Sequence, residues 1–412
     1  MPLVPRRVSS LHYAWFIAFT GIGTILVSLG LGRFALGMLL PSMGTTLNLS
    51  YGEMGLISTT NFLGYLIAVL VAGRMAARWG ARALITAALI LIGLSLLAVS
   101  QAHGAIAAMV SYGLTGLGSG AATVPVMGLV SHWFAPHWRG KAAGLMVTGN
   151  GLGIMASGLL IPWVNSHWGA AGWRISWLVF GSAALLVAVW AGLVLRGAPQ
   201  QHGLQPLGHR ETHTGPTVTP PTPRQERRLV WQLGGIYALF GITYVIYVTF
   251  IVTTLIQERG FSESAAGIFW FWLGFLSLFS GPIFGSLSDH LGRRIGLIVV
   301  FALQGVAYLL VAAPLPTPWL YLSIGLFGLC AWSIPSIMAA AAGDYLGPQH
   351  AVAAFGTMTF IFGIGQMLGP VLAGWLAEAS GSFTSSYGLA AALAVVAIGL
   401  TWPLPRPVSR KS

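Results

Sequence analysis

The sequence contains very little charge. Its 412 residues include 20 Lys and Arg and 8 Asp and Glu, so only 7% of the chain is charged. An ordinary soluble domain carries about 25% charged residues. Hydrophobic residues make up 56% of the chain, and so few charges cannot cover the surface of a soluble protein of this size. The composition excludes a soluble enzyme, a disordered chain and a fibrous protein, and it predicts an integral membrane protein.

Cysteine and the common catalytic motifs are also scarce. The single cysteine, Cys330, lies in an apolar run, which excludes an intrachain disulfide and argues against a thiolate metal site. The sequence has no Gly-rich nucleotide loop ending in Lys-Ser or Lys-Thr, no zinc-ligand spacing and no serine-hydrolase elbow. We therefore expect no enzyme activity, no metal and no cofactor. A membrane enzyme or a non-transporting sensor remains an alternative that no motif supports.

Long apolar runs make up most of the chain. A membrane-spanning helix needs about 20 mostly apolar residues. The segment 196–228 is polar and Pro-rich, which predicts a cytoplasmic linker between an N-terminal bundle (1–195) and a C-terminal bundle (229–412). The prediction is an all-α membrane protein with twelve spans, at approximately 13–41, 52–72, 83–101, 105–131, 140–163, 170–195, 229–256, 265–288, 295–313, 318–342, 351–377 and 383–403.

The basic residues are distributed unevenly between these spans. If the N-terminus is cytoplasmic, 17 of the 20 Lys and Arg residues fall in cytoplasmic segments, and only Arg33, Arg174 and Arg259 do not. Cytoplasmic loops of membrane proteins are enriched in Lys and Arg. We therefore expect both termini in the cytoplasm and a multi-pass protein in the plasma membrane, the inner membrane of a bacterium. The net charge of +12 is explained by topology, so no nucleic-acid partner is expected.

An internal repeat relates the two halves. Gly73, Gly80 and Arg82 follow the second span, and Gly285, Gly292 and Arg294 follow the eighth, each 212 positions later. The same offset relates three glycines of the fifth span to three of the eleventh, namely Gly144, Gly151 and Gly153 to Gly356, Gly363 and Gly365. Parallel repeats of six spans are typical of transporters built from two bundles.

The two repeated loops resemble the signature of the major facilitator superfamily, Gly-x-Leu-x-Asp-Arg-x-Gly-Arg-Arg/Lys. The second loop matches well through Gly285, Leu287, Asp289, Gly292, Arg293 and Arg294, whereas the first has Ala77 in place of the aspartate. The resemblance implies two six-helix bundles, alternating access, and loops whose carboxylate and arginine latch one state. The gating residues it implies are Gly73, Arg82, Gly285, Asp289, Gly292 and Arg293, with the weaker latch in the first loop. Topogenic charge alone is the alternative.

Arg33 is the candidate for the substrate site. It lies inside an apolar run, and a charged side chain within a span normally faces a cavity or a partner. Of the eight acidic residues only Glu53 is close in the topology, so Arg33 is predicted to hold an anionic group of the substrate. Two alternatives stay open at this level: Arg33 extends to the membrane surface, or it pairs with Glu53. Arg174 is expected to be structural.

Further polar residues in the spans are candidate substrate contacts. They are Asn61, Tyr65, Asn150, Tyr244 and Gln366; in hydrocarbon such side chains need a partner, which is either another helix or a ligand. The blocks around Arg33, Asn61 and Gln366 resemble the little-characterised bacterial YbfB/YjiJ-type branch of the superfamily. The stretch from Trp133 to Gly144 is similar to monocarboxylate and oxalate/formate-type carriers.

Two departures from the family pattern argue against a drug/proton antiporter. The region 148–153 lacks the Gly-Pro pair of the antiporter motif, and Tyr112 stands near the place of the usual arginine.

The sequence thus predicts a secondary transporter for a small organic anion such as a monocarboxylate. The alternative is an efflux pump for amphipathic or toxic compounds. The expected partners are the lipid bilayer and an anionic small molecule, with the protein a monomer. Proton coupling stays open, because no carboxylate clearly lies at mid-span.

Overall fold

The structure is a computed structural model that describes residues 12–208 and 223–405. The middle of the predicted linker, 209–222, and the two chain ends, 1–11 and 406–412, lie outside the described residues. Within the described part, helices account for almost all regular structure. The dominance of helices follows from the apolar composition, because in hydrocarbon every backbone N–H and C=O must be satisfied inside its own segment.

The first half of the chain forms six long helical segments. The first runs without interruption from Ala14 to Leu47, and a π-helical stretch at Leu26–Phe34 separates α1 from α2. A short 3-10 turn at Gly169–Ala171 joins the fifth and sixth segments. The helices of this half are α1 (Ala14–Ile25), α2 (Ala35–Leu47), α3 (Tyr51–Trp79), α4 (Ala81–Ser100), α5 (Ala105–Trp133), α6 (Pro136–Trp168) and α7 (Gly172–Val194).

The second half has the same order of elements, with one difference. Its first helix also ends in a π-helical turn, at Thr254–Glu258, but its fourth span is broken at residues 331–332 into α11 and α12. The helices are α8 (Pro223–Thr253), α9 (Glu263–Leu291), α10 (Arg293–Ala312), α11 (Thr317–Cys330), α12 (Ser333–Leu346), α13 (Pro348–Ser380) and α14 (Thr384–Thr401).

The helix boundaries repeat the offset seen in the sequence. The segments that start at residues 51, 81, 105, 136 and 172 have counterparts that start at 263, 293, 317, 348 and 384, each 212 residues later. By length and composition, eleven described segments can cross a membrane, and one of them, His137–Val194, contains both α6 and α7. Counting these two helices separately gives the twelve predicted passes. Several segments are longer than predicted, among them 14–47 rather than 13–41, 51–79 rather than 52–72 and 136–168 rather than 140–163, and the first helix of the second half begins at 223 rather than 229.

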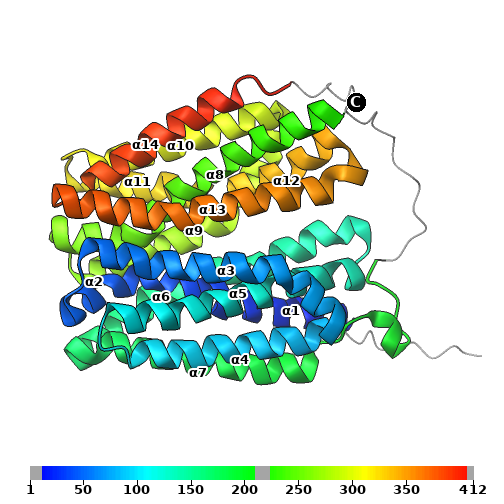
Figure 1. Cartoon of the computed structure of the whole chain (residues 1–412), viewed down its shortest axis with the longest axis horizontal. Coiled ribbons are helices and arrows are strands. Elements are labelled where there is room, and N and C mark those ends of the chain that lie inside the picture. Colours follow the sequence, from blue (N-terminus) through cyan, green and yellow to red (C-terminus); the bar gives the residue numbers. More distant parts are fainter. Residues whose placement is uncertain (1–11, 209–222, 406–412) are drawn as a thin grey trace, which may run out of the picture.

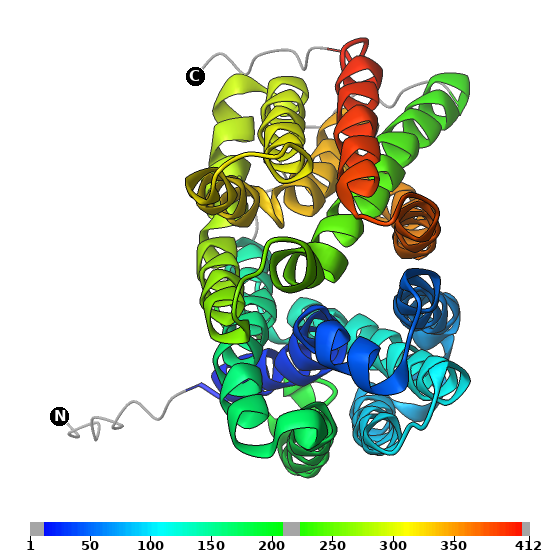
Figure 2. The same ribbon diagram turned by 90° about the vertical axis from the view of Figure 1, so that its left-hand side faces the viewer.

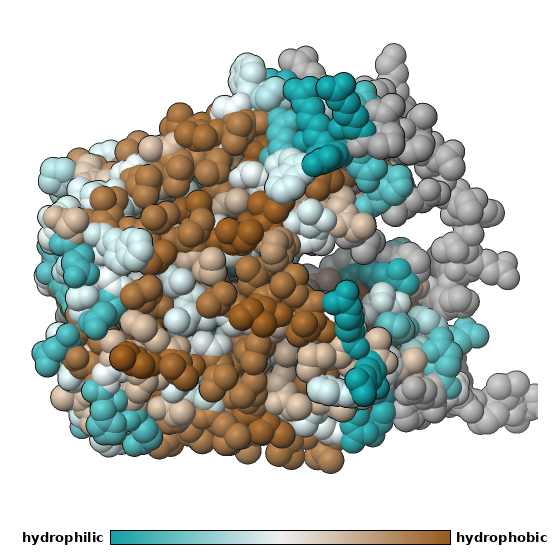
Figure 3. Space-filling model, in the orientation of Figure 1, coloured by the Kyte–Doolittle hydropathy of each residue, from teal (hydrophilic) through white to brown (hydrophobic). Residues whose placement is uncertain are grey.

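The two halves form two helical bundles that lie side by side (Figure 1). Viewed along the helices, α8–α14 lie in one group and α1–α7 in the other (Figure 2). The main packing between the groups joins α3 to α13 and α6 to α9, with a smaller contact of α2 with α8. A broad apolar surface, shown in brown in Figure 3, covers the middle of the face in view, as expected for a protein embedded in lipid.

At one end the bundles are held together by two carboxylates. Glu378, near the end of α13, accepts hydrogen bonds from the Gly52 backbone N–H at 2.8 Å and from the Ser50 hydroxyl at 3.1 Å, both at the start of α3. Asn165 of α6 donates to Glu263 of α9 at 2.9 Å. We call this end, defined by Ser50, Glu378, Asn165 and Glu263, the latch end.

At the opposite end the bundles are apart. This loop end is defined by the repeated loops 73–82 and 285–294. A Cβ atom added to Gly73, Gly144, Gly285 or Gly356 would meet no neighbouring atom within 4 Å, whereas nearer the latch end Gly55, Gly158 and Gly374 touch backbone of the other bundle. On the right of Figure 3 a notch opens between the bundles at this end. The molecule is therefore closed at the latch end and open at the loop end.

Candidate functional site

Arg33 lies in the interior, close to the middle of the first segment. It lies one residue before the end of the π-helical stretch Leu26–Phe34, and only 7% of its surface is exposed. A π-helical turn leaves backbone groups out of the regular ladder and often marks a functional position. The segment continues to Leu47, so Arg33 is farther from the membrane surface than the sequence suggested. The side chain is thus buried and does not extend to the surface.

Neutral groups of the N-terminal bundle hold the guanidinium. Its Nε donates to Asn61 Oδ1 at 3.3 Å, and the Asn61 amide donates to the Tyr112 carbonyl at 3.1 Å. The Tyr112 hydroxyl in turn donates to the Arg33 carbonyl at 2.8 Å. The Arg33 Cζ atom lies 4.7 Å from the ring centre of Phe62 and 4.1 Å from that of Tyr65, which are cation–π distances.

The C-terminal bundle adds an aromatic group to the same region. The Tyr244 hydroxyl of α8 lies close enough to Arg33 and Tyr65 to interact with them electrostatically. It also accepts a hydrogen bond from the Gln366 amide of α13. Trp332, at the break between α11 and α12, contacts Tyr244 and also Phe34, with ring centres 5.7 Å and 5.0 Å apart. Residues of both bundles therefore meet around one buried cation.

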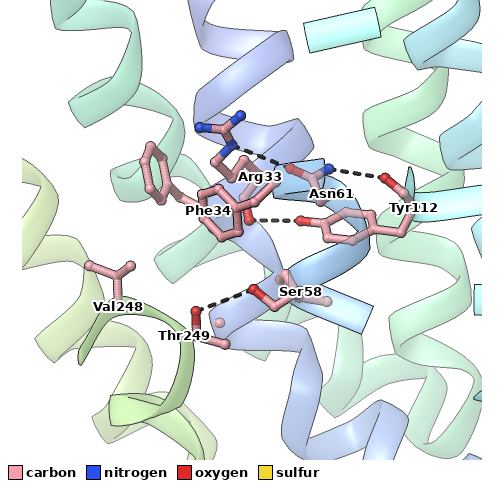
Figure 4. Close-up of a pocket in the computed structure, with 10 residues that line it drawn as sticks. Arg33, Phe34, Ser58, Asn61, Tyr112, Val248 and Thr249 are labelled. Atoms are coloured by element: carbon pink, nitrogen blue, oxygen red, sulfur yellow. Dashed lines mark hydrogen bonds between the residues drawn. The ribbon is translucent and has the colours of Figure 1, made fainter. Parts of the chain in front are cut away.

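A small pocket lies beside Arg33 (Figure 4). Residues of α3 and α5 line it on one side, and Val248 and Thr249 of α8 close it on the other. The hydroxyls of Ser58 and Thr249 lie 3.4 Å apart across the two bundles. The enclosed space holds about one water molecule, so a larger ligand requires the bundles to move.

Five of the six predicted substrate contacts lie together around this region: Arg33, Asn61, Tyr65, Tyr244 and Gln366. The sixth, Asn150 of α6, is 8% exposed, and its Oδ1 atom has no hydrogen-bond partner. Its neighbours Gly149 and Gly151 pack against α1 and α9 respectively. Asn150 is therefore a buried polar group between helices of both bundles, without a described contact to Arg33.

Glu53 is engaged away from Arg33. It lies in the first turn of α3, where its carboxylate accepts from the Ser50 backbone N–H at 2.9 Å while the Ser50 hydroxyl accepts from the Glu53 N–H. This reciprocal pair is a capping box. Glu53 therefore does not neutralise Arg33 in this structure, because its carboxylate caps the N-terminus of its own helix, α3, instead.

The second repeated loop forms a charged cluster inside its own bundle. Arg293 makes an ion pair with Asp289 and contacts Asp344 of α12 at 2.7 Å. Arg293 also donates to the Ser288 hydroxyl at 2.7 Å. Gly292 has a φ angle of +92°, a left-handed conformation that favours glycine and separates α9 from α10. In this conformation the cluster ties three helices of the C-terminal bundle together.

The first repeated loop has the same backbone turn without the carboxylate. Gly80 has a φ angle of +83° and separates α3 from α4 as Gly292 separates α9 from α10. Arg82 is exposed, and Gly73 faces open space. Of the predicted gating residues, Gly285, Asp289, Gly292 and Arg293 thus surround one ion-pair cluster, whereas Gly73 and Arg82 do not form an equivalent.

Sequence reasoning missed the latch residues and did not single out Trp332. The latch residues Ser50, Asn165, Glu263 and Glu378 carried no motif, although acidic residues are so rare here that each acid near a span end was a usable signal. The sequence indicates Trp332 only as one of several aromatic candidates for the lining of a central cavity, and packing within a bundle is the more common role of such residues. The position of Trp332 follows from the break at residues 331–332, for which Pro335 is the signal in the sequence, because a proline disrupts the helix at the residue four positions earlier.

Comparison with known proteins places the chain among transporters. It is 26% identical over 403 residues to the hexuronate transporter of Bacillus subtilis, covering 92% of each chain. It is 23% identical over 384 residues to the probable sulfoacetate transporter SauU of Cupriavidus necator, covering 88% of this chain and 87% of that one. Human monocarboxylate transporter 2 is 24% identical over 84% of this chain and 76% of its own.

Solved structures share the fold. A bacterial homologue of the human lysosomal transporter Spinster, in an inward-facing and occupied conformation, superposes with a TM-score of 0.74 at 15% identity over 96% of this chain and 97% of that one. A D-xylose–proton symporter superposes with a TM-score of 0.73 at 15% identity over 96% and 99% of the two chains. These similarities confirm the predicted two-bundle fold.

The sequence model of one family matches residues 25–402, nearly the whole chain. Its description is "Uncharacterised MFS-type transporter YbfB". The match includes Arg33, the pocket and both repeated loops, and it confirms the resemblance drawn from the sequence. The chain is therefore a multi-pass membrane protein and a member of the YbfB-type family of major facilitator transporters.

Proposed function

We propose that this protein is a secondary transporter that moves a small organic anion, such as a monocarboxylate, by alternating access. The observation that carries the proposal is Arg33, a buried cation held by neutral groups between the two bundles, whose Nη2 atom has no hydrogen-bond partner. A guanidinium binds carboxylates through directed hydrogen bonds. The names of the relatives support an anion, since hexuronate, sulfoacetate and monocarboxylates are all organic anions.

The proposal includes an orientation in the membrane. The loop end carries Arg74, Arg78, Arg82, Arg293 and Arg294, and basic clusters favour the cytoplasmic side. With the loop end in the cytoplasm, this conformation is open to the inside, and both termini are cytoplasmic in a bacterial inner membrane. In the opposite state the repeated loops would approach the other bundle, and Asp289 and Arg293 would then act as the gate.

We propose that proton coupling involves the substrate itself. None of the residues lining the pocket beside Arg33 is acidic, so no pocket carboxylate is available to carry a proton. A carboxylic acid substrate binds as the anion and is moved together with a proton. A proton gradient should then drive accumulation without any single acidic residue of the pocket being essential.

The test is uptake into proteoliposomes that contain the purified protein. The probes are radiolabelled lactate, benzoate and D-glucuronate, each measured with and without an inward proton gradient. Arg33→Gln should lower uptake of the transported anion by about 100-fold, because a hydrogen-bonded charge contact is worth about 1.5–3 kcal/mol. Arg33→Lys should retain part of the activity, since it keeps the charge but loses the planar donor geometry.

Arg174→Gln is the matched control. Arg174 lies at the latch end, where it donates to the Ser100 carbonyl at 2.7 Å, and its loss should leave uptake within about twofold of wild type after correction for folded protein. Uptake by Arg33→Gln at the wild-type rate would contradict the anion proposal. Arg33-independent export of a hydrophobic cation such as ethidium would favour the efflux alternative.

A further inference from the structure

The polar side chains around Arg33 largely satisfy one another. Asn61 uses its oxygen for Arg33 and its amide for the Tyr112 carbonyl. Gln366 donates to Tyr244, and Ser58 pairs with Thr249. A substrate with several hydroxyl groups would therefore find most side-chain amides and hydroxyls here already in use. Buried hydroxyls without partners are costly, so this site disfavours polyhydroxylated ligands.

Two donors in this region have no partner. They are the Nη2 atom of Arg33 and the indole Nε1 of Trp332, and both are buried. The Trp332 ring contacts Phe34, which is the residue next to Arg33. It also contacts Tyr244, whose hydroxyl interacts with the Arg33 guanidinium. Buried donors in native proteins are almost always hydrogen-bonded. One cationic donor from the N-terminal bundle and one neutral donor from the C-terminal bundle thus remain for a ligand.

The break in the fourth span of the C-terminal bundle positions Trp332. α11 ends at Cys330 and α12 begins at Ser333, whereas α5, the repeat-related helix, continues without interruption from Ala105 to Trp133. The Trp332 backbone N–H donates to the Ser280 hydroxyl of α9 at 3.2 Å, which anchors the break. Trp332 is therefore held outside a regular helix, with its ring against residues of the site.

Apart from these polar groups, the site is surrounded by aromatic rings, and Arg33 is the positive charge within it. Aromatic rings come from both bundles: Phe34, Phe62, Tyr65, Tyr244, Trp332 and Phe362. Arg174 and Arg259, the other two arginines that the sequence places outside the cytoplasmic segments, donate to backbone carbonyls of residues 100, 311 and 313. A second anionic group on the substrate would thus have no cation to meet it.

We infer that the substrate is a monoanion with one carboxylate and a flat, apolar or aromatic body, and that Trp332 is a specificity-determining residue for it. This inference rests on the proposed function and narrows its substrate class. The carboxylate binds Arg33 Nη2, the body lies between the aromatic rings, and Trp332 Nε1 donates the second hydrogen bond from the opposite bundle. Sugar acids and dicarboxylates are disfavoured, the first by their hydroxyls and the second by their additional charge.

The test measures binding to the purified full-length protein by thermal shift and by equilibrium dialysis. The probes are benzoate, its neutral analogue benzamide, D-glucuronate and malonate. Benzoate should bind the wild-type protein at least about tenfold more tightly than each of the other three, the equivalent of one hydrogen bond to a charged group. Since benzamide changes only the ligand, this comparison does not depend on whether a variant folds.

Two variants locate the binding determinants. Trp332→Phe keeps an aromatic ring but removes the indole N–H, and it should weaken benzoate binding by about tenfold with an unchanged melting temperature of the ligand-free protein. Trp272→Phe is the matched control, because Trp272 of α9 is 50% exposed on the outer surface. Unchanged benzoate affinity in Trp332→Phe would overturn the role of Trp332.

The outcomes separate this inference from the broader proposal. If D-glucuronate or malonate binds in an Arg33-dependent manner and benzoate does not, the substrate class is wrong and the anion transporter remains. If benzamide binds as tightly as benzoate and Arg33→Gln has no effect, the anion proposal itself fails. Binding of benzoate that depends on both Arg33 and Trp332 supports both.

Discussion

At the scale of single residues, Arg33 is stabilised without an acidic partner. Its neighbours are the Asn61 amide, two aromatic rings, and a tyrosine whose hydroxyl donates to the Arg33 backbone carbonyl. Cation–π contacts and neutral hydrogen bonds offset part of the cost of burying a guanidinium while leaving its charge uncompensated. A fixed carboxylate in the same place would compete with an anionic substrate, so this neutral environment suits an anion site.

Glycine sets the position of Asn61 and hence of Arg33. A Cβ atom on Gly116 of α5 would lie 1.9 Å from the Asn61 carbonyl oxygen, which is backbone and cannot move aside. Gly116→Ala should separate α3 from α5, destabilise the protein by about 1–3 kcal/mol and weaken benzoate binding. The measurement is thermal unfolding in detergent with and without benzoate.

Gly128→Ala provides the control on the same helix. A Cβ atom on Gly128 would meet nothing within 4 Å, so its stability should be unchanged or slightly raised. Equal stability of the two alanine variants would show that close approach of α3 and α5 at Gly116 is not required.

At the scale of helices, the latch end illustrates how a few acidic residues control the contact between the bundles. Glu378 supplies negative charge to the N-terminus of α3, where unpaired N–H groups and the helix dipole favour it. Glu258 has the same chemistry at the start of α14, accepting from the Phe383 N–H at 2.7 Å. The difference is that Glu378 bridges the two bundles, whereas Glu258 acts within one.

Removing the bridging carboxylate should therefore open the latch end. Glu378→Ala is expected to shift the equilibrium away from this closed arrangement by about tenfold or more, the equivalent of lost hydrogen bonds to a charged group. The measurement is the distance distribution between spin labels at His103 and Thr317, two exposed positions at the latch end, in a Cys330→Ala background. Longer distances should become populated.

Glu258→Ala removes an equivalent cap without touching the other bundle. It should lower stability but leave the distance distribution unchanged, because α14 and Glu258 belong to the same bundle. If Glu378→Ala and Glu258→Ala give the same distribution, Glu378 does not hold the latch end closed.

At the scale of the whole molecule, closure at one end and separation at the other describe one state of a rocking transporter. The bundles contact each other through α3 with α13 and α6 with α9, and small residues such as Gly158 and Gly267 bring these helices within backbone contact. In rigid-body rocking about a central site, these contacts must open when the loop end closes.

A covalent link at the latch end should then stop transport. Asn165 and Glu263 face each other across the bundles with their side chains in hydrogen-bond contact. Cysteines at these positions, joined by a short thiol cross-linker in the Cys330→Ala background, should reduce uptake of lactate, benzoate or D-glucuronate to background. Each single-cysteine variant treated with the same reagent is the control. Normal uptake by fully cross-linked protein would exclude rocking about this site.

The sequence by itself determined the class, the number of passes and the repeat. These properties are local: each span is recognised from about 20 consecutive residues whose transfer into lipid is favourable, and the repeat is carried by glycines such as Gly80 and Gly292 that the turn conformation requires. Arg33 was recognisable for the same reason, since a charge within an apolar run is costly wherever the helix faces.

The tertiary structure alone decided which groups surround that charge. Whether Glu53 meets Arg33 or caps its own helix depends on how α2 and α3 are rotated and where the chain turns between them. The meeting of Arg33 with Tyr244, Gln366 and Trp332 depends on packing between helices more than 200 residues apart. Lipid provides no hydrophobic preference between these arrangements, so close packing of small residues and a few hydrogen bonds select among them, and neither can be read from the sequence of one span.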